Sequence, residues 1–207
     1  MSRTLRNASA MLMLVALLVT ACATTTQIKS LWKDPDYQSH PARIMVIGVA
    51  KDPLERRLFE DEFVLQLKAR GTEAIASYTV LPDKQQDNQS AIAAKVKELS
   101  ADSVLITRLV SKKTVHTYVP GSVYYPPPYY GTWPDYYGYG YRYIYSPGYI
   151  AEDEYAVMET NLYETGQDKL IWAASSETMM THANHKQIKS YVAIMVDSMA
   201  GYGLLGR

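Results

Sequence analysis

Arg43–Val49 reads Arg-Ile-Met-Val-Ile-Gly-Val, and Asp52-Pro53-Leu54-Glu55 follows it after two residues. A short continuous apolar run is typical of a strand that is covered on both faces of a sheet. In the second stretch the aspartate can cap the free amides of a helix, the proline suits the first helical position, and the glutamate can close a capping box. The sequence therefore predicts a buried strand and then a helix from Pro53 to about Arg70, which Gly71 ends.

The chain beyond this stretch continues with alternating strand and helix patterns. Strands are expected at Glu73–Tyr78 and Ser103–Val110, with a helix over Gln89–Ser100 between them. The βαβαβ order with short links predicts a parallel core with right-handed crossovers.

The second half predicts antiparallel pairing. Glu154–Glu164 and Lys169–Met179 have strand patterns, and Thr165-Gly166-Gln167-Asp168 between them is typical of a hairpin turn. An amphipathic helix is expected from Asn184 to about Met199. The expected fold class is therefore α/β with a mixed sheet: βαβαβ, an antiparallel hairpin, a C-terminal helix and a long insertion rich in Tyr, Pro and Gly.

Several side chains have expected places in this fold. Ile47 is expected in the core. The helix over 53–70 carries two apolar stripes (Leu54, Leu58 and Leu65; Phe59, Phe63 and Leu67), so we expect it to be covered on more than one side. The acidic run Glu60-Asp61-Glu62 is interpreted as a solvated helix face. Trp32 and Trp172 are interpreted as packing residues.

Composition excludes some classes of protein. The 207 residues contain 21 basic and 21 acidic side chains, so the chain lacks the basic surplus that an electrostatic nucleic-acid binder needs. The single cysteine, Cys22, excludes a disulfide framework and a cysteine-based zinc site.

The N-terminus has the pattern of a secretory signal. Arg3 and Arg6 precede the apolar run Met11–Val19, which is too short to span a bilayer as a helix. The run ends in Val19-Thr20-Ala21-Cys22, which resembles the lipobox of bacterial lipoproteins. That resemblance implies cleavage before Cys22 and acylation of this residue. Ala23 in place of an aspartate then implies the outer membrane, facing the periplasm. The alternatives are an ordinary signal peptide with a chance cysteine, or a buried cysteine.

The domain organisation follows from this reading. Residues 1–21 are expected to be the signal peptide and residues 22–42 the lipidated N-terminus with a tether, because residues 23–30 are small and polar. Residues 43–207 are expected to form the periplasmic domain, with the aromatic loop at 118–150.

The body also resembles a group of short, uncharacterised bacterial lipoproteins over nearly all of residues 22–207. The matching stretches are Trp32-Lys33-Asp34-Pro35, Arg56-Arg57, Phe59-Glu60-Asp61, Glu159-Thr160-Asn161-Leu162-Tyr163 and Leu170-Ile171-Trp172. The element order is similar to that of penicillin-binding-protein activator and curli-assembly lipoproteins. This resemblance implies a fold and a location but no catalytic residue.

The segment from Tyr118 to Tyr149 contains 12 Tyr, 6 Pro and 5 Gly among 32 residues. Pro and Gly disfavour both helix and regular strand, and a loop this long in a compact domain is usually functional or disordered. Tyrosine offers broad contact area at little entropic cost, so the segment is a candidate binding surface. The candidate residues are Trp133 and, with period-two spacing, Tyr139, Tyr141 and Tyr143. The alternative is a low-complexity spacer.

Candidates for catalysis are weak. His182 and His185 have i, i+3 spacing but no accompanying H-E-x-x-H pattern, and Ser175-Ser176 is not in a nucleophile elbow. We therefore expect no catalytic residue, no metal and no organic cofactor.

Three functions stay open. The first is a non-catalytic lipoprotein that binds a periplasmic protein or a cell-wall glycan through the aromatic loop. The second is a self-associating assembly factor of the envelope. The third is a hydrolase acting on envelope polymers.

Overall fold

The computed structural model describes residues 26–121, 147–180 and 185–206. Its strands form one six-stranded sheet in the order β1-β6-β5-β4-β2-β3. The elements are β1 (Thr26–Lys33), β2 (Arg43–Val49), α2 (Pro53–Ala69), β3 (Glu73–Ala76), the 3-10 turns η1 (Ser77–Thr79) and η2 (Asp83–Gln85), α3 (Gln89–Glu98), β4 (Ser103–Val119), β5 (Tyr149–Glu164), β6 (Lys169–Met179) and α5 (His185–Gly201).

The sheet is mixed, as the sequence predicts. β2 lies between β3 and β4 and pairs in parallel with both, with α2 and α3 as the crossovers. The β4–β5, β5–β6 and β6–β1 pairs are antiparallel. The α/β fold class is therefore confirmed, including the hairpin between β5 and β6 and the C-terminal helix.

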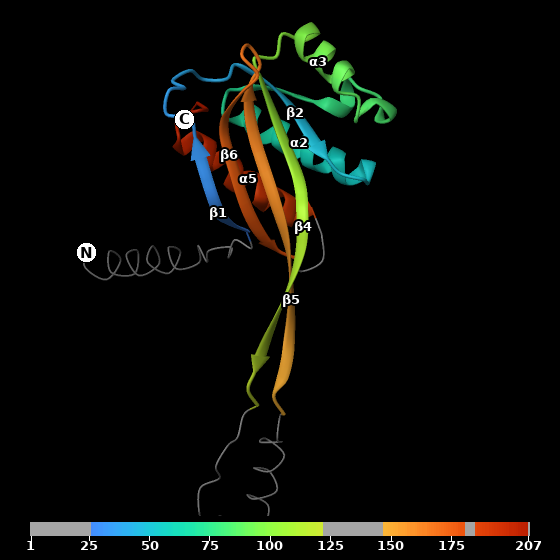
Figure 1. The fold of residues 1–207 in the computed structure, drawn as a ribbon, viewed down its shortest axis with the longest axis vertical. Helices are drawn as coiled ribbons and strands as arrows, with labels where there is room; N and C mark the ends of the chain where they lie inside the picture. Colours follow the sequence, from blue (N-terminus) through green and yellow to red (C-terminus); the bar gives the residue numbers. More distant parts are fainter. Residues whose placement is uncertain (1–25, 122–146, 181–184, 207) are drawn as a thin grey trace, which may run out of the picture.

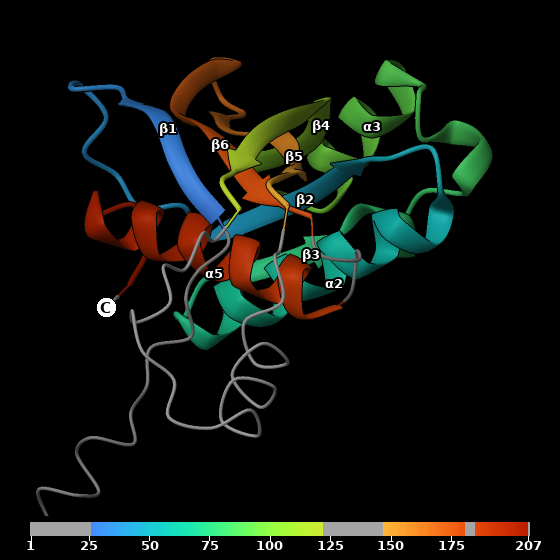
Figure 2. The ribbon, with the colours of Figure 1, turned by 90° about the horizontal axis from the view of Figure 1, so that it is seen from below.

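The helices cover the two faces of the sheet unequally. Figure 2 shows α2 and α5 together on one face and α3 on the other face, near β2 and β4. Ile44 and Val46 of β2 belong to the large core under α2 and α5, whereas Met45 and Ile47 belong to a smaller core under α3. The predicted burial of this strand on both faces is confirmed, and so is the core position of Ile47.

Helix α2 begins and ends where the sequence predicts. The Asp52 carboxylate accepts a 2.9 Å hydrogen bond from the Leu54 amide, and Gly71 follows the helix with φ +78°. The expectation of cover on more than one side is confirmed, because α2 packs against both the sheet and α5. The stripe of Leu54 and Leu65 is not part of that cover, since these side chains are 63% and 61% exposed. Only the stripe that includes Phe63 faces the core, since α2 packs on the sheet and α5.

The acidic run in α2 is not solvated as expected: Glu60 and Glu62 are buried, and only Asp61 is exposed. Glu60 Oε1 accepts from the Arg56 Nε at 2.9 Å, from the Ser77 hydroxyl at 2.7 Å and from the Gly48 amide at 3.0 Å. Its Oε2 accepts from the Tyr78 amide at 2.9 Å. These four donors compensate the buried charge of Glu60. Its carboxylate therefore connects α2, through hydrogen bonds, to the ends of β2 and β3.

The expected tether is also partly wrong. Residues 26–33 form β1, an edge strand that pairs with β6 from Thr26↔Thr178 to Lys33↔Trp172, with a bulge between Ile28 and Ser30. Trp172 is buried, as expected of a packing residue, but Trp32 on the edge strand is 46% exposed.

Candidate functional site

Strands β4 and β5 are much longer than the sequence predicts, and they leave the sheet together. β2 stops pairing with β4 at Val49↔Arg108, and β6 stops pairing with β5 at Met179↔Tyr155. Beyond these points, Thr114–Val119 pairs only with Tyr149–Glu154 among the described residues. We call these twelve residues the ribbon. Figure 1 shows that it projects well past the other strands.

The ribbon is held by its own ladder and a few cross-strand contacts. His116 lies opposite Glu152, with 3.4 Å between Nδ1 and Oε1, and Tyr118 lies opposite Ile150. Val115 lies opposite Asp153, and most of these side chains are exposed. An isolated two-stranded hairpin is at best marginally stable in water. Burial therefore does not explain why this pair of strands extends so far.

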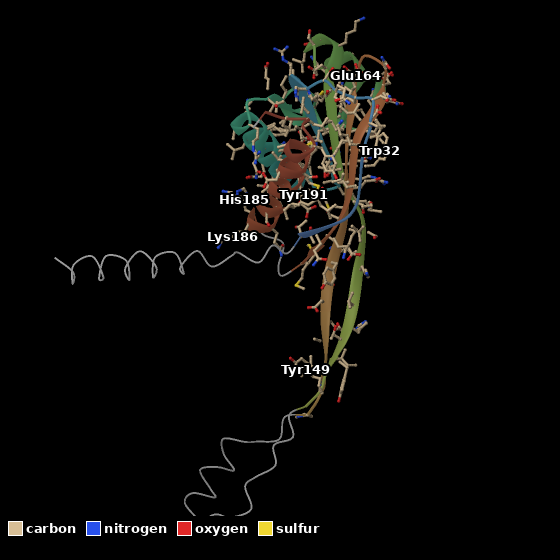
Figure 3. The ribbon with its side chains drawn as sticks, turned by 90° about the vertical axis from the view of Figure 1, so that its left-hand side faces the viewer. Trp32, Tyr149, Glu164, His185, Lys186 and Tyr191 are labelled. Carbon is tan, nitrogen blue, oxygen red and sulfur yellow. The ribbon has the colours of Figure 1, made fainter. Side chains whose placement is uncertain are left out.

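The end of the ribbon is aromatic and uncharged. Tyr118, Tyr149 and Ile150 are 68%, 61% and 63% exposed. Gly148 lies under the Tyr118 ring, and a Cβ at this position would collide with the hydroxyl end of that ring. Tyr149 lies at the far end of the ribbon from the helices (Figure 3). Tyr118 and Tyr149, at the two ends of the aromatic segment, therefore form a solvent-facing surface at the end of the ribbon.

The base of the ribbon carries a linked set of charges. Glu177 on β6 contacts Lys29 of β1 at 3.2 Å and Lys113 of β4 at 3.3 Å. The hydrogen bond from Lys29, with a smaller contribution from Lys113, lowers the pKa of Glu177 below its ordinary value. This carboxylate therefore joins three strands close to where β4 and β5 leave the sheet.

The predicted site residues fall outside the described residues. They are Cys22, Trp133, Tyr139, Tyr141 and Tyr143, and His182 is also among the undescribed positions. The structure places the two flanks of the aromatic segment side by side at the ribbon end, with Val119 opposite Tyr149. Tyr118, Tyr149 and Ile150 were expected in the aromatic loop at 118–150, whereas they lie in the paired strands β4 and β5. Their high β-propensity was a signal for this pairing.

The other candidate residue, His185, begins α5. Its Nε2 lies 3.9 Å from Oε2 of the buried Glu62. Within 26–121, 147–180 and 185–206, no group of three or more His, Cys, Asp or Glu is placed to hold a metal ion. None of the helices in these ranges is long and apolar enough to cross a membrane.

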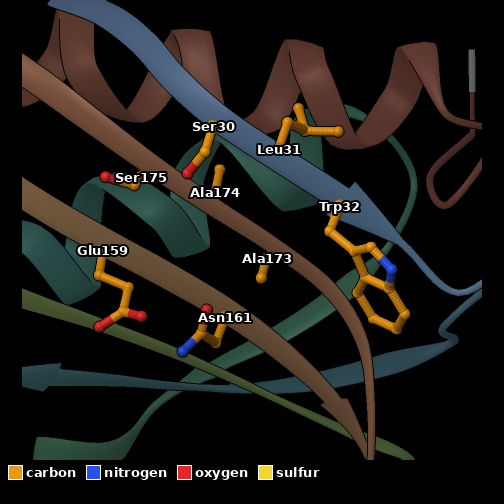
Figure 4. A pocket seen from close by; sticks show the side chains of 8 residues that line it. All are labelled: Ser30, Leu31, Trp32, Glu159, Asn161, Ala173, Ala174 and Ser175. Atoms are coloured by element: carbon orange, nitrogen blue, oxygen red, sulfur yellow. The ribbon is translucent and has the colours of Figure 1, made fainter.

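A shallow hollow lies on the face of β1, β5 and β6 (Figure 4). Trp32, Asn161 and Glu159 line it over a floor of small side chains, and its volume is about 140 Å³. Pockets for drug-sized ligands measure roughly 300–1,000 Å³. This hollow is therefore a minor feature of the sheet surface.

No protein-family model and no curated protein sequence matches the chain. Solved structures with a similar fold include a point variant of the PelC dodecamer from Paraburkholderia phytofirmans, at 11% identity and TM-score 0.48, covering 88% of this chain and 99% of that one. They also include Lipoprotein GNA1162 from Neisseria meningitidis, at 14% identity and TM-score 0.42, covering 78% and 99%. A neuraminyllactose-binding hemagglutinin homolog from Helicobacter pylori is similar at 11% identity and TM-score 0.27, covering 80% of each chain. At these identities and scores the likenesses assign no function.

Proposed function

We propose that this protein is a lipoprotein anchored to the outer membrane through Cys22, and that its periplasmic domain is a non-catalytic binding module. Its binding element is the aromatic segment between the two strands of the ribbon. The observation that carries the proposal is the projection of β4 and β5 beyond the sheet, which places Val119 and Tyr149, the residues that flank this segment, away from the body (Figure 1).

The energetics of the ribbon support a binding role. Ordering a residue costs about 1–2 kcal/mol of backbone entropy, and a typical hydrogen bond returns only about 0.5–1.5 kcal/mol. Six cross-strand pairs with mostly exposed side chains therefore add little to the stability of the domain. Elements of low local stability that protrude into solvent are commonly those that bind partners.

The aromatic segment can be tested by crosslinking in intact cells. The variant Tyr139→Ser/Tyr141→Ser/Tyr143→Ser should lose most of the crosslinked products that the unmodified protein gives. Tyr202→Ser is the matched control, because Tyr202 is half-exposed on the body, and it should leave the products unchanged. An unchanged product pattern in the triple variant would contradict the proposal.

The anchor has its own test. The unmodified protein should incorporate labelled palmitate, and Cys22→Ala should not. Equal absence of label in both proteins would show that Cys22 is not acylated.

A second function, self-association, is favoured by the charges of the ribbon strands. β4 carries Lys112 and Lys113, whereas β5 carries Glu152, Asp153 and Glu154, and both outer edges lack strand partners among the described residues. Opposite charges on cross-strand neighbours are stabilising, so β4 of one copy suits β5 of the next. Size-exclusion chromatography should then show an oligomer that dissociates at high salt and in the variant Glu152→Gln/Asp153→Asn/Glu154→Gln. A monomer at low salt would exclude this assembly.

A further inference from the structure

The first described residue of the chain lies at the base of the ribbon. Thr26 pairs with Thr178, and Thr178 pairs in turn with Ala156 of β5. A 2.9 Å hydrogen bond joins the buried hydroxyls of Thr26 and Thr178, so the start of β1 is fixed to the sheet. In Figure 1, β1 begins at the end of the body from which β4 and β5 project.

The distance from Cys22 to the start of β1 and the length of the ribbon together limit where the membrane can lie. Four peptide steps separate Cys22 from Thr26, and a fully extended chain spans at most about 14 Å over that distance. Seven residue-to-residue steps lead from Ala156 to Tyr149, which corresponds to about 24 Å along β5. The ribbon therefore extends further from the body than the anchored residue can, and from the same end of the body.

We propose that the end of the ribbon, formed by Tyr118, Val119, Tyr149 and Ile150, contacts the phospholipid headgroup layer of the membrane in which Cys22 is anchored. This inference rests on the acylation of Cys22 in the proposed function and names a partner for the ribbon. The lipid surface is a second attachment point beside the acyl chains, and it fixes the orientation of the domain.

The chemistry of the ribbon end suits a membrane interface. Its last two cross-strand pairs, Tyr118↔Ile150 and Val119↔Tyr149, carry no charge. Tyrosine rings prefer the headgroup level, where the ring is in an apolar layer and the hydroxyl stays hydrated. The unpaired backbone groups on the ribbon edges keep it out of the hydrocarbon core, because each would lose its water there. The ribbon end therefore stays at the interface.

The charges behind the ribbon end indicate which lipids are needed. Lys112 and Lys113 precede the ribbon on β4, and Glu152, Asp153 and Glu154 within the ribbon outnumber them, so the ribbon has no basic patch. Contacts with anionic lipids rely on clusters of Lys and Arg. Binding should therefore occur on zwitterionic phospholipid and should depend little on salt.

The experiment uses the mature chain, residues 22–207, with Cys22→Ser so that no acyl chain is present. This protein should float with vesicles of phosphatidylcholine, and adding phosphatidylglycerol or salt should change the bound fraction little. The variant Tyr118→Ser/Tyr149→Ser/Ile150→Ser should weaken binding at least about tenfold, because three exposed apolar side chains are lost. Leu54→Ser/Tyr202→Ser removes comparably exposed side chains from the body and should bind like the parent.

Hydrogen exchange gives a second readout that does not depend on variants. Amides of Thr114–Val119 should exchange more slowly when vesicles are added, while those of β3 should not change. The inference is overturned if the parent does not bind vesicles, or if the ribbon-end variant binds as well as the parent. If crosslinking to other envelope components still depends on Tyr139, Tyr141 and Tyr143, the proposed function survives that failure. If the crosslinks are also independent of these tyrosines, both proposals fail.

Discussion

The two halves of β4 and β5 lie in different environments although they belong to the same strands. In the sheet, Ser103, Leu105 and Thr107 of β4 are buried and alternate with half-buried neighbours that face α3. In the ribbon, Thr114–Val119 is mostly exposed and has one strand neighbour instead of two. The first half therefore contributes to the core, whereas the second half is a projection from it. Matched variants in the two halves show whether the ribbon contributes to the stability of the body.

Breaking a charged pair should give the largest difference in lost unfolding free energy between the body and the ribbon. Arg56→Met leaves Glu60 buried without its cation, and breaking a buried pair in this way costs about 3–5 kcal/mol. Glu152→Gln breaks the ribbon contact with His116. Both side chains of this contact are exposed, so the substitution should cost less than about 1 kcal/mol. Urea unfolding of both variants tests this. Similar losses of unfolding free energy in the two would show that the ribbon is part of the cooperative unit.

Shortening an apolar side chain should give the next largest difference in stability loss between the body and the ribbon. Leu105 is fully buried, and Leu105→Ala should cost about 2–5 kcal/mol because it leaves a cavity. Ile150 lies in the ribbon half of β5 and is 63% exposed, so Ile150→Ala should cost less than half as much. Thermal melts of both variants provide the comparison. An equal loss of stability would contradict the separation of the two halves.

The smallest effect should be a dependence on pH at the junction of body and ribbon. The pKa of Glu177 is lower in the folded state than its ordinary value of 4.5, mainly through Lys29 and then Lys113. Its stabilisation is therefore present above that value and is lost as the pH falls through the lowered pKa. Glu177→Gln should lose less stability than the parent between about pH 6 and about pH 3. Lys29→Met should reduce this pH dependence more than Lys113→Met does, and the reverse order would contradict the assignment.

Much of the body could be predicted from local patterns. The apolar run of β2, the cap at Asp52 and the glycine after α2 act within a few residues of one another, so the sequence alone indicates the strand and the limits of the helix. The turn between β5 and β6 was predictable for the same reason. The burial of Glu60 was not, because its donors come from β2, from Arg56 and from the end of β3.

The candidate site was less predictable than the body. The apolar pattern of the sequence ends at Val110, and the ribbon beyond it is mostly exposed and has no buried face to mark it. Its existence depends on the register between β4 and β5, which is a long-range property of the chain. The composition of the aromatic segment indicated where a binding element lies, and Trp133, Tyr139, Tyr141 and Tyr143 stay predictions.

The central claim is that the ribbon and its aromatic segment form a separable binding element. Its most direct test is in-cell crosslinking of a chain in which residues 114–154 are replaced by Asn-Gly, a sequence that closes two-residue hairpins between antiparallel strands. The account predicts that this chain keeps a cooperative melting transition close to that of the parent and loses the crosslinked products. A truncated chain that no longer folds, or one that folds and gives the full set of products, would contradict the claim.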